Sequence, residues 1–154
     1  MWRMRCGLMA WRWLGSMIFS ILLMMTLLTG CETQYQSAGL AGGYRQFVGP
    51  GHLQYVHFSG NGYSDASKIQ IFALYRVAET AQAVRKPYFI IYDSLRNAAN
   101  NSPSDLPRVG TLGNKPSAYA FVLYRDVAED GAFETAAVLA KYEKQVKNVV
   151  QPSR

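Results

Sequence analysis

The apolar residues of the chain are distributed unevenly, and the longest uninterrupted apolar run lies near its beginning. Residues 14–28 are uncharged and mostly apolar, and they follow a stretch that carries Arg3, Arg5 and Arg12 but no acid. A basic start, an apolar middle and small residues at the end are typical of a secretory signal peptide. The run is shorter than the roughly 20 apolar residues of a membrane-spanning helix, so a spanning anchor is the second choice. We therefore predict a signal peptide over residues 1–30.

Farther along, the pattern changes to the alternation that is typical of β-strands. In the run LQYVHFSG, Val56 and Phe58 fall on one face of an extended chain. Tyr55 and His57 fall on the other face, and we expect Val56 and Phe58 to face the core. A Gly-Pro-Gly turn separates this strand from another β-rich run, residues 44–48, which predicts a hairpin.

The next segment, residues 60–86, has helical spacing. Its apolar positions recur every three or four residues, at Ile69, Phe72, Ala73, Val77, Ala81 and Val84. Ser64 or Asp65 is a suitable N-cap, and Pro87 ends the helix. The following residues, 88–93, are rich in aromatic and β-branched side chains and predict a third strand.

Residues 94–117 break this regularity, because they are rich in Asn, Pro, Gly and Ser. They predict a long polar loop, and loops of this length are usually functional or disordered. A fourth strand over residues 118–126 and a helix over residues 130–150 complete the pattern. We expect Asp130 to be the N-cap of this helix.

The predicted elements follow the order strand-strand-helix-strand-strand-helix. This order favours an α+β domain over residues 44–150, a ββαββα two-layer sandwich. In it, two helices pack on one face of a four-stranded antiparallel or mixed sheet. Before this domain, residues 31–43 are small and polar with several glycines, which predicts a flexible tether.

The end of the apolar run carries a motif with its own chemistry. Leu28-Thr29-Gly30-Cys31 resembles the lipobox of bacterial lipoproteins, in which an aliphatic residue and two small ones precede a cysteine. The resemblance implies cleavage between Gly30 and Cys31, with S-diacylglycerol and an N-acyl chain such as palmitate on Cys31. Such a group exceeds the two signals that stable anchoring needs. In many Gram-negative lipoproteins, Asp directly after the cysteine retains the protein in the inner membrane. This chain has Glu32 at that position, which favours the outer membrane.

Composition narrows the range of functions once the predicted signal peptide is removed. The remaining 154 − 30 = 124 residues make a single domain, with 16 − 3 = 13 basic and 10 acidic residues, a charge of +3. The basic residues are scattered, so we expect no nucleic-acid partner. Cys6 leaves with the signal peptide and Cys31 is acylated, which leaves no thiol for cysteine catalysis or a thiolate metal site. We expect no metal and no cofactor.

A further resemblance covers roughly residues 44–139. A strand ending in Phe-x-Gly-Asn, a helix reading Ala-Leu-x-Arg-x-Ala-Glu and a Tyr-Phe-rich strand ending in Asp are similar to a family of small Gram-negative lipoproteins of unassigned function. The matching residues are Phe58, Gly60, Asn61, Ala73, Leu74, Arg76, Ala78, Glu79, Tyr88, Phe89 and Asp93. One departure is Gln54, where an aromatic residue is expected. Within the helix motif, Arg76 and Glu79 form either a solvated pair or a buried network that orients the helix. The resemblance implies an envelope location and a fold, but no activity.

The sequence contains no clear catalytic motif, and the candidate residues for chemistry are two histidines and two aspartates. His52 and His57 are isolated, and surface or packing roles are the simpler interpretation. Asp93, at the end of a strand, is a candidate binding residue, although an aspartate there also commonly bonds the loop backbone. Paired with Asp126, it defines the main alternative function, a membrane-tethered periplasmic hydrolase that uses two carboxylates.

Aromatic residues are the remaining candidates for binding. The chain has ten tyrosines and seven phenylalanines, and strands favour aromatic residues for packing as well as for recognition. We select Tyr55 and Tyr124 as candidate binding residues. We thus expect a non-enzymatic, lipid-anchored protein of the outer membrane that faces the periplasm and binds an envelope protein or peptidoglycan. A purely structural lipoprotein is the last alternative.

Overall fold

The computed structural model describes residues 32–147 of the 154-residue chain. The predicted signal peptide, its cleavage site after Gly30 and the lipidation site Cys31 lie outside the described residues. The same holds for residues 148–150, the end of the last predicted helix.

The described chain is an α+β domain, as the order of predicted elements indicated. Its elements are β1 (Gly43–Val48), β2 (Gln54–Ser59), α2 (Ala66–Ala83), β3 (Tyr88–Tyr92), α3 (Leu95–Ala99), β4 (Arg108–Leu112), β5 (Lys115–Arg125), β6 (Phe133–Glu134) and α4 (Thr135–Lys147). All strand pairings are antiparallel. The predicted layout of four strands and two helices is wrong in its numbers, because the described residues form six strands and three helices. The unpredicted elements are the short α3, β4 and β6.

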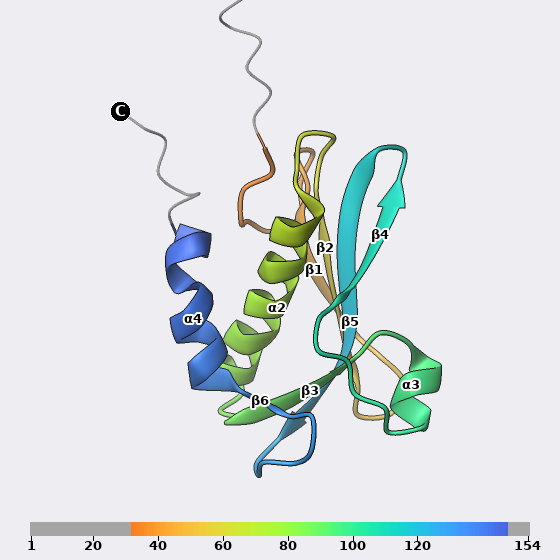
Figure 1. The fold of residues 1–154 in the computed structure, drawn as a ribbon, viewed down its shortest axis with the longest axis vertical. Coiled ribbons are helices and arrows are strands. Elements are labelled where there is room, and N and C mark those ends of the chain that lie inside the picture. Colours follow the sequence, from red (N-terminus) through yellow and green to blue (C-terminus); the bar gives the residue numbers. More distant parts are fainter. Residues whose placement is uncertain (1–31, 148–154) are drawn as a thin grey trace, which may run out of the picture. The chain divides into compact units, whose positions relative to one another are not determined.

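β5 is the central strand of the sheet (Figure 1). The strands follow the order β1-β2-β5-β3-β6, and β4 also pairs with β5. On the edge of β5 opposite β2, β4 pairs with residues 115–119 and β3 pairs with residues 121–125. β2 and β3 are therefore parallel to each other with β5 between them, and α2 connects them.

α2 begins where the sequence predicts and ends at Ala83, earlier than the predicted stop at Pro87. The carboxylate of Asp65 accepts a hydrogen bond from the backbone N–H of Ser67 at 2.9 Å, which caps the first turn. At the other end, Arg85 has a φ of 57°, and the N–H of Lys86 donates to the carbonyl of Ala81 at 2.8 Å. A residue with left-handed backbone after the last turn is a common helix stop, and here the predicted proline comes two residues later.

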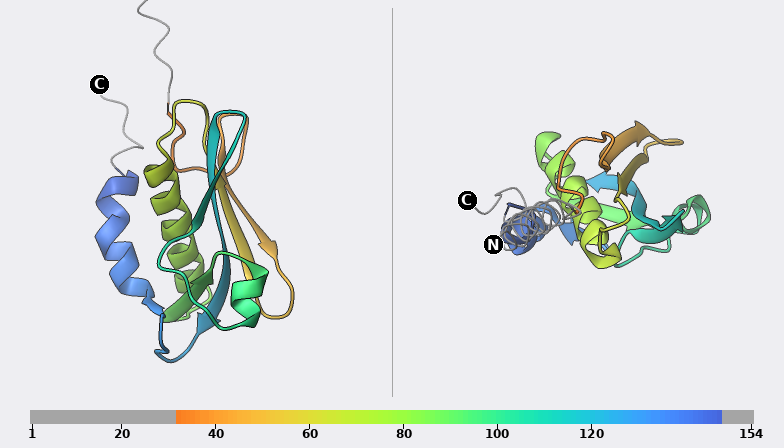
Figure 2. Two further views of the ribbon diagram at one scale, coloured as in Figure 1. Left: turned by 45° about the vertical axis from the view of Figure 1, so that its right-hand side comes forward. Right: turned by 90° about the horizontal axis from the view of Figure 1, so that it is seen from above.

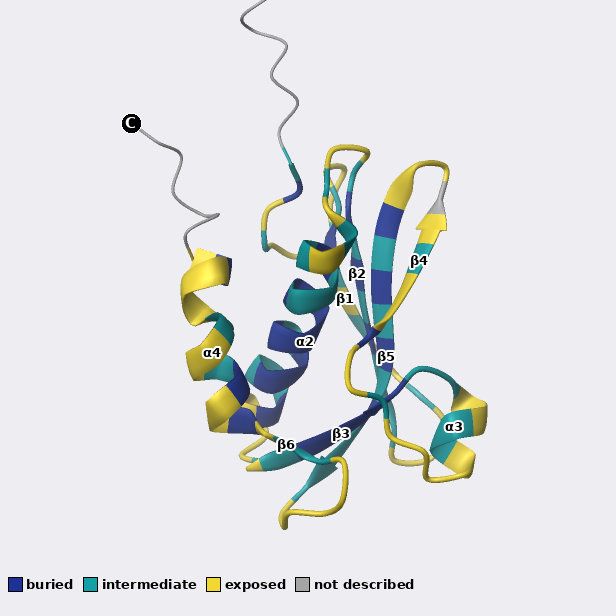
Figure 3. Ribbon diagram, viewed as in Figure 1, coloured by how far each residue is buried: buried dark blue, intermediate teal, exposed yellow. Residues whose placement is uncertain are grey.

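The core lies between α2 and the sheet. Val56 and Phe58 are fully buried, which confirms the direction predicted for them. The predicted apolar positions of α2 are buried as far as Ala81, and Val84 beyond the helix end is exposed. They pack against alternate residues of the neighbouring strands, namely Ala118, Ala120, Val122, Phe89 and Ile91. Figure 3 shows the buried residues concentrated on α2 and on these strands.

α4 begins later than predicted, and Asp130 is exposed in the preceding loop rather than at its N-cap. Phe133 instead lies in β6 and pairs with Phe89 of β3, and the two rings stack with their centroids 5.4 Å apart. This tertiary pairing holds the chain extended as far as Glu134. α4 lies on the same side of the sheet as α2, but it packs mainly along α2 rather than on the strands (Figures 1 and 2).

Residues 94–117 were predicted to be one long polar loop, but they contain regular structure. Ser94 caps α3 by accepting a hydrogen bond from the N–H of Asn97 at 3.2 Å. Gly113 and Asn114 have φ values of 55° and 59° and form the tight turn between β4 and β5. Two consecutive positive φ angles are the geometry of a two-residue hairpin turn. β4 forms because β5 offers it a partner, which the local sequence does not reveal.

The described part of the predicted tether, residues 32–43, is attached to the domain at several points, although residues such as Leu40 between them are exposed. Thr33 is 1% exposed, and its hydroxyl donates to the carbonyl of Ala41 at 2.7 Å. The same hydroxyl accepts from the N–H of Asn61 at 2.8 Å, and the N–H of Thr33 donates to Ser64 Oγ at 3.2 Å. A small polar residue is thus held here by three hydrogen bonds rather than by apolar burial.

Tyr35 is the second attachment point of this segment. Its ring lies among those of Tyr44, Phe58, Phe72 and Tyr75, with centroid distances of 5.4–6.0 Å. Aromatic pairs at these distances attract one another beyond the burial of their area. The average composition of the segment predicted flexibility, but Thr33 and Tyr35 are among the residues that attach it to the domain.

Candidate functional site: the open face of the sheet

The face of the sheet opposite α2 is the candidate site. Because side chains alternate along a strand, the residues between the core positions of β1, β2 and β5 point to this face. They include Arg45, Phe47, Tyr55, His57, Tyr119 and Phe121, which the strand register places on the same side. α2 and α4 lie on the other side of the sheet (Figure 2), so this part of the surface is not covered by them.

Four rings gather around Tyr55 on this face, and we call the five together the aromatic patch: Phe47, Tyr55, His57, Tyr119 and Phe121. The ring centroid of Tyr55 lies 6.2 Å from Phe47, 6.3 Å from His57, 6.0 Å from Tyr119 and 5.1 Å from Phe121. Phe47 is 52% exposed. Single exposed apolar residues are common, whereas contiguous apolar patches often mark interaction sites.

Positive charge borders the aromatic patch. Arg45 lies opposite His57 across the strand pair, Arg108 lies opposite Tyr119, and both arginines are exposed. Burial, together with the charge of Arg45, lowers the pKa of His57, so this imidazole is neutral near pH 7. Burial, with Tyr119 nearby, raises the pKa of Tyr55 and keeps its hydroxyl protonated. The site therefore presents neutral rings with two guanidinium groups beside them.

The segment that follows β3 closes one side of this face. Ile90 and Tyr92 point in the same direction as the patch, yet they are only 1% and 2% exposed. The hydroxyl of Tyr92 donates to Asn101 Oδ1 at 3.0 Å, and the N–H of Ser104 donates to the carbonyl of Ile91 at 2.9 Å. α3 and the residues after it contact β3 on this side, which leaves β1, β2 and part of β5 open.

The two tyrosines selected from the sequence do not share a site. Tyr55 lies at the centre of the aromatic patch, whereas Tyr124 points to the α2 side and packs against the core. Burial raises the pKa of Tyr124 to about 12. Tyr124 is therefore a packing residue. Sequence reasoning missed Arg45, Phe47, Arg108 and Phe121, although the alternation of β1 and β5 carried the signal for the two phenylalanines.

Asp93 has a local structural role. Its carboxylate accepts a hydrogen bond from the side-chain amide of Asn97 at 2.6 Å, and its N–H donates to Ser104 Oγ at 3.1 Å. Asp126, its partner in the hydrolase alternative, instead forms an ion pair with Lys86 at 2.7 Å. These contacts agree with the simpler interpretation of an aspartate that ties down a loop.

The structure does not bring the two carboxylates together. Asp126 follows Arg125, which pairs with Tyr88, whereas Asp93 follows Tyr92 at the other end of β3. At about 3.3 Å per residue, the length of β3 separates them by on the order of 15–20 Å. Glycosidases need their two carboxyl groups within about 10 Å of each other, so this pair does not have the geometry of that mechanism.

Arg76 and Glu79 form the network that the sequence left as one of two alternatives. Arg76 Nη1 lies 3.2 Å from Glu79 Oε2, and both side chains are about two-thirds buried, at 27% and 32% exposure. The hydroxyl of Tyr35 donates to the same carboxylate oxygen, and the guanidinium stacks over the ring of Tyr44 at 4.1 Å. This pair therefore attaches the N-terminal segment to α2.

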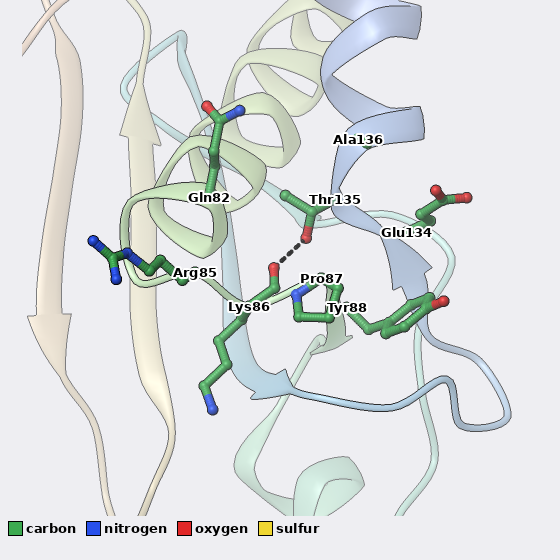
Figure 4. Close-up of a pocket in the computed structure, with 8 residues that line it drawn as sticks. All are labelled: Gln82, Arg85, Lys86, Pro87, Tyr88, Glu134, Thr135 and Ala136. Carbon is green, nitrogen blue, oxygen red and sulfur yellow. Dashed lines mark hydrogen bonds between the residues drawn. The ribbon is translucent and has the colours of Figure 1, made fainter.

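A pocket of about 310 Å³ lies where α2 turns into β3, beside the start of α4 (Figure 4). Thr135 closes one wall, because its hydroxyl donates to the carbonyl of Lys86 at 2.8 Å. The charged ends of Arg85, Lys86 and Glu134 point away from one another in Figure 4. A site for chemistry needs polar groups that converge on one point, so we do not assign a function to this pocket.

Within residues 32–147, no group of three or more His, Cys, Asp or Glu side chains is placed to hold a metal ion. None of the helices in this part of the chain is long and apolar enough to cross a membrane. Comparison of the chain with protein-family models, with curated proteins and with solved structures finds no match.

Proposed function

We propose that the protein is a lipid-anchored envelope lipoprotein that binds a protein partner through the aromatic patch. The lipobox supports the anchor, and Glu32 after the cysteine favours the outer membrane with the domain in the periplasm. The observation that carries the binding role is the cluster of five rings on an uncovered sheet face. We propose binding rather than catalysis, with no cofactor.

The composition of the patch favours a protein partner. Tyrosine and arginine are enriched among the residues that dominate protein interfaces, and they act best near the centre of a contact. Here Tyr55 is central, and Arg45 and Arg108 lie at the margin, where charge guides the approach of a partner. An acidic and aromatic or aliphatic surface is the expected complement.

The free part of the β1 edge adds a second way to hold a partner. Tyr44 uses its outward backbone groups to bond Gln36 and Ala38, at 2.9 Å and 3.0 Å. Two residues on, the backbone groups of Gln46 point the same way, and no such bond to them occurs among the described residues. Val48 at the strand end is 82% exposed. An extended partner segment can add to such an edge while its side chains contact the neighbouring patch.

In-cell photo-crosslinking tests the proposal. A photoreactive phenylalanine analogue at Phe47 is expected to give a protein adduct of defined mass, because Phe47 is exposed at the edge of the patch. The same analogue at Val127, which is 64% exposed and lies outside the patch, is the matched control. Arg45→Ala and Tyr55→Ala are each expected to reduce the adduct at Phe47 without lowering the amount of protein.

Two other outcomes identify the alternatives. Release of the crosslinked product only after digestion of the cell wall would favour peptidoglycan, whose sugar rings and carboxylates also suit tyrosine and arginine. Adducts that are identical at Phe47 and Val127, or absent from both, would remove the binding role and leave a structural lipoprotein.

A further inference from the structure

The described chain becomes fixed to the domain two residues after the predicted acylation site. Thr33 is 1% exposed and is held by hydrogen bonds to Ala41, Asn61 and Ser64. Only Glu32 stands between Thr33 and the predicted acylation site, Cys31, and a chain spans at most about 3.6 Å per residue. A lipid on that cysteine must therefore emerge at this end of the domain.

Three further segments meet at this end. The carboxylate of Glu32 pairs with Lys68 at 2.6 Å. The N–H of Gly60 donates to the carbonyl of Pro116 at 2.8 Å, which joins the loop before α2 to the β4–β5 hairpin. Figure 1 shows that loop and the β4–β5 turn at the same end of the sheet. We call this surface the anchor end: Glu32, residues 39–41, residues 60–64 and residues 113–115.

The anchor end carries side chains that suit a lipid surface. Leu40 is fully exposed, and Tyr63 is 71% exposed. Tyrosine is enriched at the level of lipid headgroups, and a leucine stabilises interfacial binding by burying its side chain below them. Lys115 is exposed in the adjacent turn and can reach lipid phosphates. The nearby acid Glu32 is neutralised by Lys68.

We propose that the anchor end lies against the phospholipid surface, with Leu40 and Tyr63 in the headgroup region. This inference rests on the lipid anchor of the proposed function and adds an orientation to it. The short connection prevents the domain from turning freely, so the sheet stands with its strands pointing away from the membrane.

Tyr55 is four residues from the end of β2 at Ser59, about 13 Å along the strand. The aromatic patch then faces sideways, close to the bilayer, and its partner binds there.

Tryptophan fluorescence can report this orientation. The three tryptophans of the chain all lie within residues 1–13, so the processed protein has none. Tyr63→Trp therefore places a single fluorophore at the anchor end, and Val127→Trp places one beyond the far end of β5. Each protein is purified from membranes and reconstituted in phosphatidylethanolamine and phosphatidylglycerol vesicles whose acyl chains carry bromine near the headgroup.

Bromine quenches tryptophan only at short range, so the proposal predicts several-fold stronger quenching for Tyr63→Trp than for Val127→Trp. A ten-residue Gly/Ser insertion between Glu32 and Thr33 provides the second test. It keeps the residue after the cysteine and releases the domain, so the quenching of Tyr63→Trp is expected to fall to the level of Val127→Trp. Equal quenching at both positions or stronger quenching of Val127→Trp would overturn the proposal. Quenching of Tyr63→Trp that the insertion leaves unchanged would overturn the role of the short connection, because Leu40 and Tyr63 would then hold the orientation by themselves.

Intact mass spectrometry of the same samples separates this inference from the anchor on which it depends. A mass that includes the diacylglyceryl and N-acyl groups, together with equal quenching, would refute the orientation and leave the anchor in place. A mass without lipid, combined with loss of vesicle binding, would refute the anchor and the orientation with it. The Cys31→Ser variant provides the reference for the unlipidated state.

Discussion

The two faces of the sheet are built from the same strands and the same kinds of residue, but they differ in what covers them. On the α2 side, Phe58 and Phe89 are fully buried, and Tyr124 packs at the edge of the core. On the open side, Tyr55 and Phe121 keep part of their surface exposed, and arginines lie beside them. Aromatic content alone therefore does not distinguish a core from a binding face. The neighbouring element decides, because α2 excludes water from one face only.

Paired alanine substitutions should separate the two faces most strongly. Phe58→Ala removes a fully buried ring and is expected to lower the free energy of unfolding by about 3–5 kcal/mol. Tyr55→Ala, three residues away on the open face, is expected to cost only about 1 kcal/mol. Urea unfolding followed by circular dichroism measures both values. Equal losses would mean that the open face is part of the core.

Residues 32–43 lie on the α2 side of the sheet, and removal of the Tyr35 hydroxyl tests whether they are held there. Tyr35→Phe leaves the ring in place but removes the hydrogen bond to the Glu79 carboxylate. Bonds to a charged group contribute about 1.5–3 kcal/mol, so a loss in this range is expected. The matched change on the open face, Tyr119→Phe, should stay within about 0.5 kcal/mol. An unaffected Tyr35→Phe protein would show that the segment is not held as described.

The free energy of unfolding at alkaline pH should report the burial of Tyr124. Burial raises the pKa of Tyr124 from 10.0 to about 12. The stability that its neutral form contributes is therefore complete below pH 10 and is lost as the pH rises to 12, because the unfolded chain ionises first. The two-unit difference sets an upper limit of about 3 kcal/mol on this loss. Stability measured between pH 9 and pH 12 should lose part of this slope in Tyr124→Phe, and an unchanged slope would contradict the assignment.

The smallest expected effect concerns His57 on the open face. Burial and the charge of Arg45 lower its pKa below the ordinary value of 6.5. Its stabilising contribution is therefore complete above pH 6.5 and is lost as the pH falls toward the folded-state pKa, because the unfolded chain takes up the proton first. His57→Gln should flatten this dependence, and an unchanged dependence in the variant would contradict the assignment. NMR titration of the His57 imidazole tests directly whether its pKa lies below 6.5.

Local pattern predicted a large part of the fold. Alternation placed Val56 and Phe58 in the core, helical spacing and Asp65 defined the start of α2, and all four predicted strands occur in the structure. These signals are strong because each element lies against the core for most of its length. Three predictions failed for one reason: the flexibility of residues 32–43, the start of α4 and the absence of a strand at β4. In each case, contacts with residues distant in sequence override the local preference.

The candidate site was predicted only in part for the same reason. Tyr55 was correctly selected as a residue for the face opposite the core, but its neighbours come from β1 and β5 and depend on the strand register. Tyr124 was selected on the same grounds, although its position on β5 points it toward α2. A shift of one residue along a strand reverses the face of a side chain, and residue type does not indicate that choice.

By itself, the sequence determined the α+β class and the alternation of the main strands, and it carries a motif that resembles a lipobox at the end of an apolar run. These features depend on residues that are close together in the chain. Only the tertiary structure decided that Glu32 to Gly43 is attached to the domain, that Asp93 and Asp126 lie at opposite ends of β3, and which aromatic residues meet around Tyr55. The physical reason is that strand order and helix cover are set by burial of the whole core, and no local stretch of sequence contains that information.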